Sequence, residues 1–284
     1  MTLARTVREV WGADGDRWLA ALPGTLERLA ARWQLELGEP YPMTYHWVCR
    51  ARCADGAPAV LKVGLSDLAR EAAALRAWGG TGAVRLLRSD LAAGALLLQR
   101  ADPGTAATDL VPDADEQATA AAVEVLRRLH AEELPALSTS LRALAGGHQL
   151  VPRALVERAV AVARELRVDA PPEVLLHGDL HHDNVLRAGD CWLAIDPHGA
   201  VGDPGYDAGA WLYNPPGLPT AQLLELVPGR VEQLADGLGM DVDRVAAWGF
   251  VKAVLSAVWT ALDTGRTDEG AALEVAALLL PRLP

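Results

Sequence analysis

One short segment constrains this chain more than any other. It reads His177-Gly178-Asp179-Leu180-His181-His182-Asp183-Asn184 and lies between two apolar runs at 174–176 and 185–186. Another apolar run, 191–195, follows across the turn dipeptide Gly189-Asp190 and leads directly into Asp196. Two short apolar runs around such a turn predict a β-hairpin, whose open end brings Asn184 and Asp196 together. The fold must therefore present three oxygen-bearing side chains from one loop and one hairpin.

Three such side chains at this spacing indicate phosphoryl transfer. That reaction needs a carboxylate that orients and deprotonates an acceptor hydroxyl, and oxygen ligands that hold Mg²⁺ against the phosphates of ATP. Asp179 fits the first task, and Asn184 with Asp196 fits the second. A zinc site is the alternative, although the segment lacks the His and Cys spacing typical of zinc ligands. Its ligands would come from the cluster His181, His182, Asp183 and His198.

The block resembles the catalytic segment of the kinase fold, and more closely that of its small-molecule branch. His177-Gly178-Asp179-Leu180-His181 with Asn184, and Ile195-Asp196-Pro197, are similar to the aminoglycoside phosphotransferase family, as is Gly-Asp-Pro-Gly-Tyr-Asp at 202–207. Further features resemble the streptomycin 6-phosphotransferase and hydroxyurea phosphotransferase group within that family. They are Trp47-Val48, 59–63, 96–99 with 103–105, and 126–130. The resemblance extends from about residue 11 to residue 215.

The resemblance implies an α+β, two-lobed, protein-kinase-like fold. A small β-rich N-lobe with a helical N-terminal arm (1–101) would bind the nucleotide, and a larger, mainly helical C-lobe (102–284) would hold the catalytic loop, the metal site and the substrate pocket. The residue pattern agrees. Short helices are expected within 3–37, broken at 12–15 and at Pro23-Gly24, followed by a hairpin (43–53 and 58–63), a helix at 67–78 capped by Ser66, and strands at 84–87 and 95–99.

The break Asp102-Pro103-Gly104-Thr105 predicts a linker, and mainly helical sequence follows it. Helices are expected at 115–133, 154–167, 206–213, 221–227, 230–238, 242–263 and 269–280. Pro228-Gly229 is expected to separate the fourth of these from the fifth.

Lys62 is the second anchor of the functional prediction. The chain has 24 arginines and only two lysines, and Lys62 stands near the end of an apolar run. A kinase uses such a compact ammonium to hold phosphates and steadies it with a carboxylate on the next helix, for which Glu71 is the candidate. The alternative is an edge-strand lysine that reaches solvent. By resemblance, main-chain groups of Gln99 and Ala101 face adenine. No glycine occurs at 43–47, so no phosphate contact is assigned there.

The resemblance also assigns supporting and substrate-binding residues. His177 and Asp207 would support the catalytic loop. Carboxylates and aromatic faces suit guanidinium or ammonium groups, although these aromatic residues could equally be core and these acids could cap helices. The candidate substrate residues are Asp203, Tyr206, Trp211, Asn214, Asp263 and Glu269.

Charge and composition narrow the class of partner. The net charge is −11, and residues 170–284 hold 16 acidic but only 6 basic residues. An acidic field disfavours nucleic acid and anionic membranes and attracts cations, although a solvated acidic surface has the same composition. Lys252 interrupts the most apolar late stretch (245–262), and three cysteines form no disulfide pattern. We expect a cytoplasmic protein without a membrane segment or an obligate protein partner.

The predicted function is ATP-dependent transfer of the γ-phosphoryl group of Mg-ATP to a hydroxyl of an aminoglycoside such as streptomycin. Hydroxyurea, or an amino sugar or amino alcohol of metabolism, is the alternative acceptor. An inactive nucleotide-binding regulator is the alternative outside enzymes. A protein kinase is disfavoured, because no Ala-Pro-Glu follows Asp196.

Overall fold

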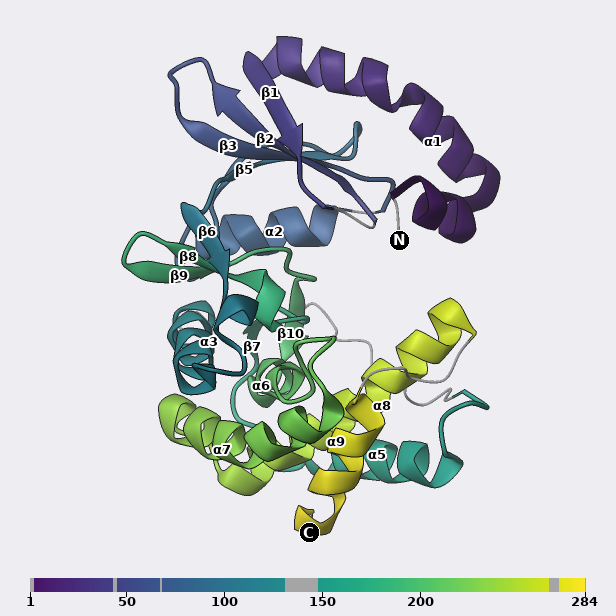
Figure 1. Ribbon diagram of the computed structural model, residues 1–284, viewed down its shortest axis with the longest axis vertical. Coiled ribbons are helices and arrows are strands. Elements are labelled where there is room, and N and C mark those ends of the chain that lie inside the picture. The colour runs from purple at the N-terminus through teal and green to yellow at the C-terminus, as the bar shows by residue number, and fades with distance from the viewer. Residues whose placement is uncertain (1–2, 43–44, 67, 131–147, 266–270, 284) are drawn as a thin grey trace. The chain divides into compact units, whose positions relative to one another are not determined.

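The computed structural model describes residues 3–42, 45–66, 68–130, 148–265 and 271–283 (Figure 1). The chain divides into two compact units, Met1–Asp102 and Pro103–Pro284. Each unit is built around its own secondary structure, and each is described separately below.

The described part of the first unit contains an antiparallel sheet of five strands in the order β1-β2-β3-β5-β4. The strands are β1 (Leu35–Pro40), β2 (Trp47–Cys53), β3 (Pro58–Val63), β4 (Leu86–Asp90) and β5 (Ala95–Gln99). The predicted hairpin around Asp55-Gly56 is confirmed as β2–β3. Its first strand begins at Trp47 rather than at Met43, which lies outside the described residues. Strand β1 was not predicted, because the sequence favoured helix through residue 37.

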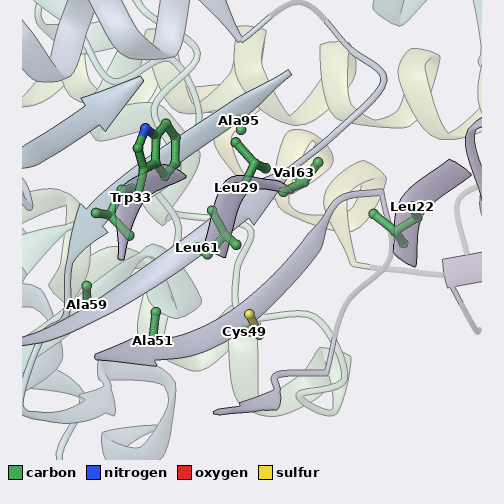
Figure 2. Packing of buried hydrophobic residues seen from close by; sticks show 10 residues of the cluster. Leu22, Leu29, Trp33, Cys49, Ala51, Ala59, Leu61, Val63 and Ala95 are labelled. Atoms are coloured by element: carbon green, nitrogen blue, oxygen red, sulfur yellow. The ribbon is translucent and has the colours of Figure 1, made fainter. Parts of the chain in front are cut away.

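Helix α1 (Leu3–Trp33) packs on one face of this sheet. Leu22, Leu29 and Trp33 meet small side chains that β2 and β3 turn toward the helix (Figure 2). The helix bends at Gly12, whose φ of 53° is non-helical, as the predicted break at 12–15 requires. The second predicted break, at Pro23-Gly24, is wrong. Because the cluster draws on residues on both sides of Pro23, packing keeps the helix continuous despite the lost hydrogen bond.

Helix α2 (Ala69–Trp78) lies on the opposite face of the sheet. Side chains alternate along a strand, so Lys62 leaves β3 on the face opposite Leu61 and Val63 and there meets Glu71 of α2. The predicted cap is wrong: the helix has Leu68 at its N-cap, with no side-chain cap, and Ser66 Oγ bonds His46 Nε2 at 2.7 Å. Strand β4 is predicted at 84–87 but runs from Leu86 to Asp90, and the turn that joins it to β5 lies at 91–94.

The second unit begins with a strand where a linker was predicted. Strand β6 (Pro103–Ala106) pairs with β8 (Val185–Ala188), which pairs with β9 (Cys191–Ala194). The β8–β9 pair is the predicted hairpin. A second small sheet joins β7 (Val174–Leu176) to β10 (Ala200–Gly202), two strands that the sequence did not predict. Short 3₁₀ turns, η1 (Ala107–Leu110), η2 (His182–Asn184) and η3 (Leu280–Arg282), connect the elements.

Helices make up most of the second unit, and α8 is at their centre (Figure 1). They are α3 (Asp115–Leu129), α5 (Arg153–Glu165), α6 (Gly205–Trp211), α7 (Thr220–Leu238), α8 (Val242–Thr264) and α9 (Ala272–Leu279). Helix α8 packs against α5, α6, α7 and α9. Within the described residues, its segment Val242–Leu262 is the one stretch long and apolar enough to cross a membrane, and most of it is buried in the unit.

The predicted break in α7 at Pro228 is wrong. Leu223, Val227, Val231 and Leu234 form a buried stripe at helical spacing on both sides of the proline. Such a stripe packs only when the helix continues, so tertiary packing outweighs the local cost of the proline.

Candidate active site

The loop after β7 is held by a buried histidine. His177 is fully buried; its Nε2 donates to the Ile195 carbonyl at 2.8 Å, and its Nδ1 accepts from the Asp179 N–H at 3.3 Å. Burial lowers the pKa of His177, against the opposing influence of Asp207. The neutral ring therefore links the start of the loop to the end of the β8–β9 hairpin.

Asp207 of α6 binds the main chain of the same loop. Its two carboxylate oxygens accept from the His177 and Gly178 N–H groups at 2.8 Å each, and His130 Nε2 lies 3.0 Å away. Burial acts to raise the pKa of Asp207, but His130, His177 and the Gly178 N–H together lower it, and the pKa lies below its ordinary value. Both residues that the resemblance assigned to loop support thus contact the loop directly.

Asp179 has a partly exposed side chain on a loop whose main chain is fixed. Its carboxylate is one-third exposed, with His181 Nε2 3.7 Å away. Its carbonyl accepts from the His181 N–H at 3.1 Å and from Asn184 Nδ2 at 3.0 Å. Gly178 has a φ of 89°, and a Cβ there would lie 2.9 Å from His198 Cβ, so only glycine fits before Asp179. The main chain is fixed while the carboxylate stays accessible.

The open end of the hairpin carries the two predicted metal ligands. The Ile195 N–H donates to the Asn184 carbonyl at 3.0 Å, so Ile195 lies opposite Asn184 and Asp196 is the next residue. Because the Asn184 amide nitrogen is engaged by the loop, its side-chain oxygen is the atom that can face a cation. Asp196 is exposed and has a φ of 59°, which Asp tolerates better than most residues. Two oxygen donors of this kind fit Mg²⁺.

The zinc alternative finds no ligand set in the described parts of the chain, where no three His, Cys, Asp or Glu side chains gather around one point. His182 is fully buried and stacks on Trp211, with ring centroids 3.6 Å apart. Burial lowers its pKa well below the ordinary value, and the charge of Arg230 acts in the same direction. This histidine is therefore part of the core.

In the first unit, Lys62 and Glu71 form the predicted ion pair. Lys62 Nζ lies 2.7 Å from Glu71 Oε2, and the two side chains are only 5% and 6% exposed. A paired, buried lysine excludes the edge-strand alternative, in which the ammonium would reach solvent. Gln99, at the end of β5, exchanges hydrogen bonds with Arg85 through its N–H and its side-chain oxygen, and Ala101 follows it, largely buried.

Among the predicted substrate residues that the structure describes, several side chains are engaged inside the unit. Asp203 is buried; one carboxylate oxygen accepts from the Gly205 N–H of α6 at 2.9 Å, and the other pairs with Arg244 of α8. Asn214 Nδ2 binds the Ala210 carbonyl at 2.9 Å. Asp203 and Trp211 are thus structural, because their polar or aromatic groups are already engaged inside the unit. Glu269 and the side chain of Asp263 lie outside the described residues.

Lys252, the second lysine, was not assigned to the site. It lies on α8, fully buried, with Nζ 3.2 Å from the Gly178 carbonyl and 4.0 Å from the ring centroid of Tyr206. Burial acts to lower its pKa, but Tyr206, Tyr213 and Asp179 together raise the pKa above its ordinary value. The Tyr206 face predicted for a substrate cation is therefore occupied by the chain's own ammonium. The available signal was the rarity of lysine combined with its place in an apolar helix.

Comparison with known proteins places this chain in a family. The profile of the aminoglycoside/hydroxyurea antibiotic resistance kinases matches residues 32–265. A streptomycin 6-kinase of Streptomyces glaucescens is 33% identical over 98% of this chain and 94% of its own length. A hydroxyurea phosphotransferase of Kitasatospora aureofaciens is 35% identical over 89% of this chain and 77% of its own length.

Solved structures agree on the fold. A choline/ethanolamine kinase family protein from Mesorhizobium loti has a TM-score of 0.64 at 18% identity, over 92% of both chains. An aminoglycoside phosphotransferase in a ternary complex with ADP and hygromycin B has a TM-score of 0.61 at 15% identity, over 90% of this chain and 95% of its own. The predicted α+β, protein-kinase-like fold is thereby confirmed. Since the profile covers most of the sequence and relatives above 30% identity span nearly all of it, the chain belongs to the aminoglycoside/hydroxyurea antibiotic resistance kinase family.

Proposed function

We propose that this protein transfers the γ-phosphoryl group of ATP to a hydroxyl of an aminoglycoside such as streptomycin. The observation that carries the proposal is the loop around Asp179. Its main chain is fixed by His177, Asp207 and Asn184, while its carboxylate stays accessible. A fixed main chain with a reactive side chain open to a small molecule is what positioning catalysis needs. Family membership supports the reaction class.

The first unit, residues 1–101 in the sequence prediction, would bind the nucleotide. Lys62, steadied by Glu71, supplies a desolvated ammonium that suits the α- and β-phosphates. Because the Gln99 N–H is engaged by Arg85, the Gln99 carbonyl and the Ala101 N–H are the groups we assign to adenine. A neighbour of the same fold was solved with ADP, which supports an adenine nucleotide as the co-substrate.

The second unit, residues 102–284 in the sequence prediction, would carry the chemistry. Asn184 and Asp196 would hold Mg²⁺, which when bound neutralises charge on the phosphates. Asp179 accepts a hydrogen bond from the acceptor hydroxyl, orients it toward the γ-phosphorus and takes its proton late in the transfer. His177 and Asp207 keep the loop in place throughout.

Streptomycin is favoured over hydroxyurea by charge. Residues 170–284 hold 16 acidic and 6 basic residues. The resulting negative field attracts an acceptor that bears guanidinium groups and does not attract a neutral acceptor. Hydroxyurea is the second candidate, because one relative is named for it. A small amino sugar or amino alcohol would also carry the favoured positive charge.

The test is ADP release with Mg-ATP against a panel of streptomycin, other aminoglycosides, hydroxyurea, amino sugars and amino alcohols. Mass spectrometry of each acceptor should find one added phosphate on streptomycin and none when Asp179→Asn replaces the wild type. If hydroxyurea alone gains phosphate, the proposed acceptor is wrong and the proposed phosphoryl transfer is right. If ATP binds but no acceptor of the panel is modified, the proposed aminoglycoside acceptor is wrong.

A further inference from the structure

A buried cation lies under the loop that carries Asp179. Lys252 of α8 is fully buried, and its ammonium contacts the Gly178 carbonyl at 3.2 Å. The ring of Tyr206 lies 4.0 Å from Nζ and that of Trp259 lies 5.4 Å away. Aromatic faces stabilise a cation partly, but an ammonium taken fully out of water also needs an anion nearby. Asp179 directly follows the glycine whose carbonyl the ammonium contacts, and its charge acts with Tyr206 and Tyr213 to raise the pKa of Lys252.

The contact completes a set of main-chain restraints around Asp179. The Gly178 N–H is held by Asp207 at 2.8 Å, the Asp179 N–H by His177 at 3.3 Å and the Asp179 carbonyl by Asn184 at 3.0 Å. Lys252 takes the one polar group between them, the Gly178 carbonyl. The peptide that joins Gly178 to Asp179 is therefore bound by a side chain at its oxygen as well as at its nitrogen.

A neutral donor would satisfy that carbonyl without the desolvation cost of an ammonium. The charge of Lys252 is explained if it also balances the carboxylate of Asp179. We propose that Lys252 is a positioning residue for phosphoryl transfer, which holds the Gly178–Asp179 peptide and provides the buried counter-charge to Asp179. The inference rests on the proposed function and concerns the same site.

Two substitutions separate the hydrogen bond from the charge. Lys252→Met removes both, whereas Lys252→Gln keeps a donor and removes the charge. Arg244→Met is the matched control, since Arg244 is also a cation on α8 paired with an acidic residue, but its partner Asp203 serves the start of α6. Each variant is measured for kcat, for KM of ATP and of streptomycin, for its melting temperature and for amide hydrogen exchange in a peptide that spans 175–181.

We expect Lys252→Met to lower kcat at least tenfold, with KM for ATP within twofold of the wild type and faster exchange in the loop peptide. Lys252→Gln should lose kcat to a similar degree while its exchange stays closer to the wild type. Arg244→Met should lower the melting temperature and leave kcat within twofold.

Three results would overturn the inference: a folded Lys252→Met with the kcat of the wild type, a Lys252→Gln variant with full kcat, or an Arg244→Met variant that loses as much kcat as Lys252→Met. If the wild type phosphorylates no acceptor, the proposed function fails first. The exchange measurement then still tests the restraint, because unchanged exchange in Lys252→Met would contradict it.

Discussion

Asp179 is the residue on which the proposed chemistry depends. Its neighbours fix its main chain from several sides, and its carboxylate alone is left for a substrate. We expect Asp179→Asn to fold and bind ATP as the wild type does, because the amide is isosteric, and to lose ~100-fold or more in kcat, because it cannot take the proton. Isothermal titration with ATP and steady-state kinetics with streptomycin check both halves. An Asn variant with kcat close to the wild type would remove Asp179 from the reaction.

The pair of Lys62 and Glu71 makes a different prediction. Glu71→Gln leaves the buried ammonium without its anion at 2.7 Å, so Lys62 should be held less well. We expect KM for ATP to rise about tenfold or more with a smaller change in KM for streptomycin, consistent with loss of a phosphate contact. A rise confined to the streptomycin KM would contradict the assignment of this pair to the nucleotide.

Stability should depend on pH through His177. Burial holds its pKa below the ordinary value, so between that value, about 6.5, and the lower folded value the unfolded state binds more protons. Stability is therefore highest above about pH 6.5 and falls as the pH drops. Buried His182 acts in the same direction. Melting temperatures measured from about pH 7.5 to 5 should fall, and less steeply for His177→Gln. An identical slope in that variant would show that His177 is not the source.

At the scale of elements, the sequence predicted most where one local signal decides. Asp55-Gly56 and Gly189-Asp190 specify their hairpins without help from the rest of the chain, and both hairpins are present. The errors fall where packing overrides a local signal. Pro23 and Pro228 interrupt neither α1 nor α7, because apolar residues on both sides of each proline are buried together. The sequence did not predict strand β1, because the strand is defined by its pairing with β2, which is a non-local contact.

In the candidate site, too, the sequence predicted what local spacing determines and missed what depends on distant contacts. The spacing along the chain was sufficient to predict a loop that carries Asp179 and a hairpin with Asn184 and Asp196 at its open end, and both elements are present. Lys252 lies about 70 residues further on, and no local pattern shows that α8 runs beneath the loop. Asp203 was misjudged for a related reason, since its partner Arg244 lies on that same distant helix.

Close packing of α6 against α8 gives an element-scale prediction. A Cβ at Gly209 would lie 2.6 Å from the Trp248 carbonyl oxygen, so Gly209→Ala must push the two helices apart. We expect a loss of about 1–3 kcal/mol in the free energy of unfolding, measured by urea denaturation. Gly229→Ala in α7 is the control, because nothing lies within 4 Å of its Cβ and alanine favours helix. Equal effects of the two substitutions would exclude helix packing as the cause.

At the scale of the molecule, charge should govern how acceptors arrive. The acidic excess lies in residues 170–284, within the unit that holds Asp179. We expect kcat/KM for streptomycin to fall as ionic strength rises from about 0.01 to 0.15 M, where the Debye length shortens from about 30 to 8 Å. The kcat should stay constant, since screening weakens attraction rather than chemistry. Steady-state kinetics at several salt concentrations in that range test this prediction. A kcat/KM independent of salt would mean that the acidic residues form a solvated surface and do not attract the acceptor.

The packing of α1 on the sheet has a consequence for N-terminal truncation of the protein. Leu22, Leu29 and Trp33 cover side chains of β2, β3 and β5 that water would otherwise reach (Figure 2). Translation from an internal start codon beyond Trp33, or proteolytic trimming to the same point, would keep every residue proposed for catalysis. The truncated protein would nevertheless expose the apolar face of the sheet. Because exposed apolar β-surface promotes aggregation, it should collect in inclusion bodies rather than confer drug tolerance.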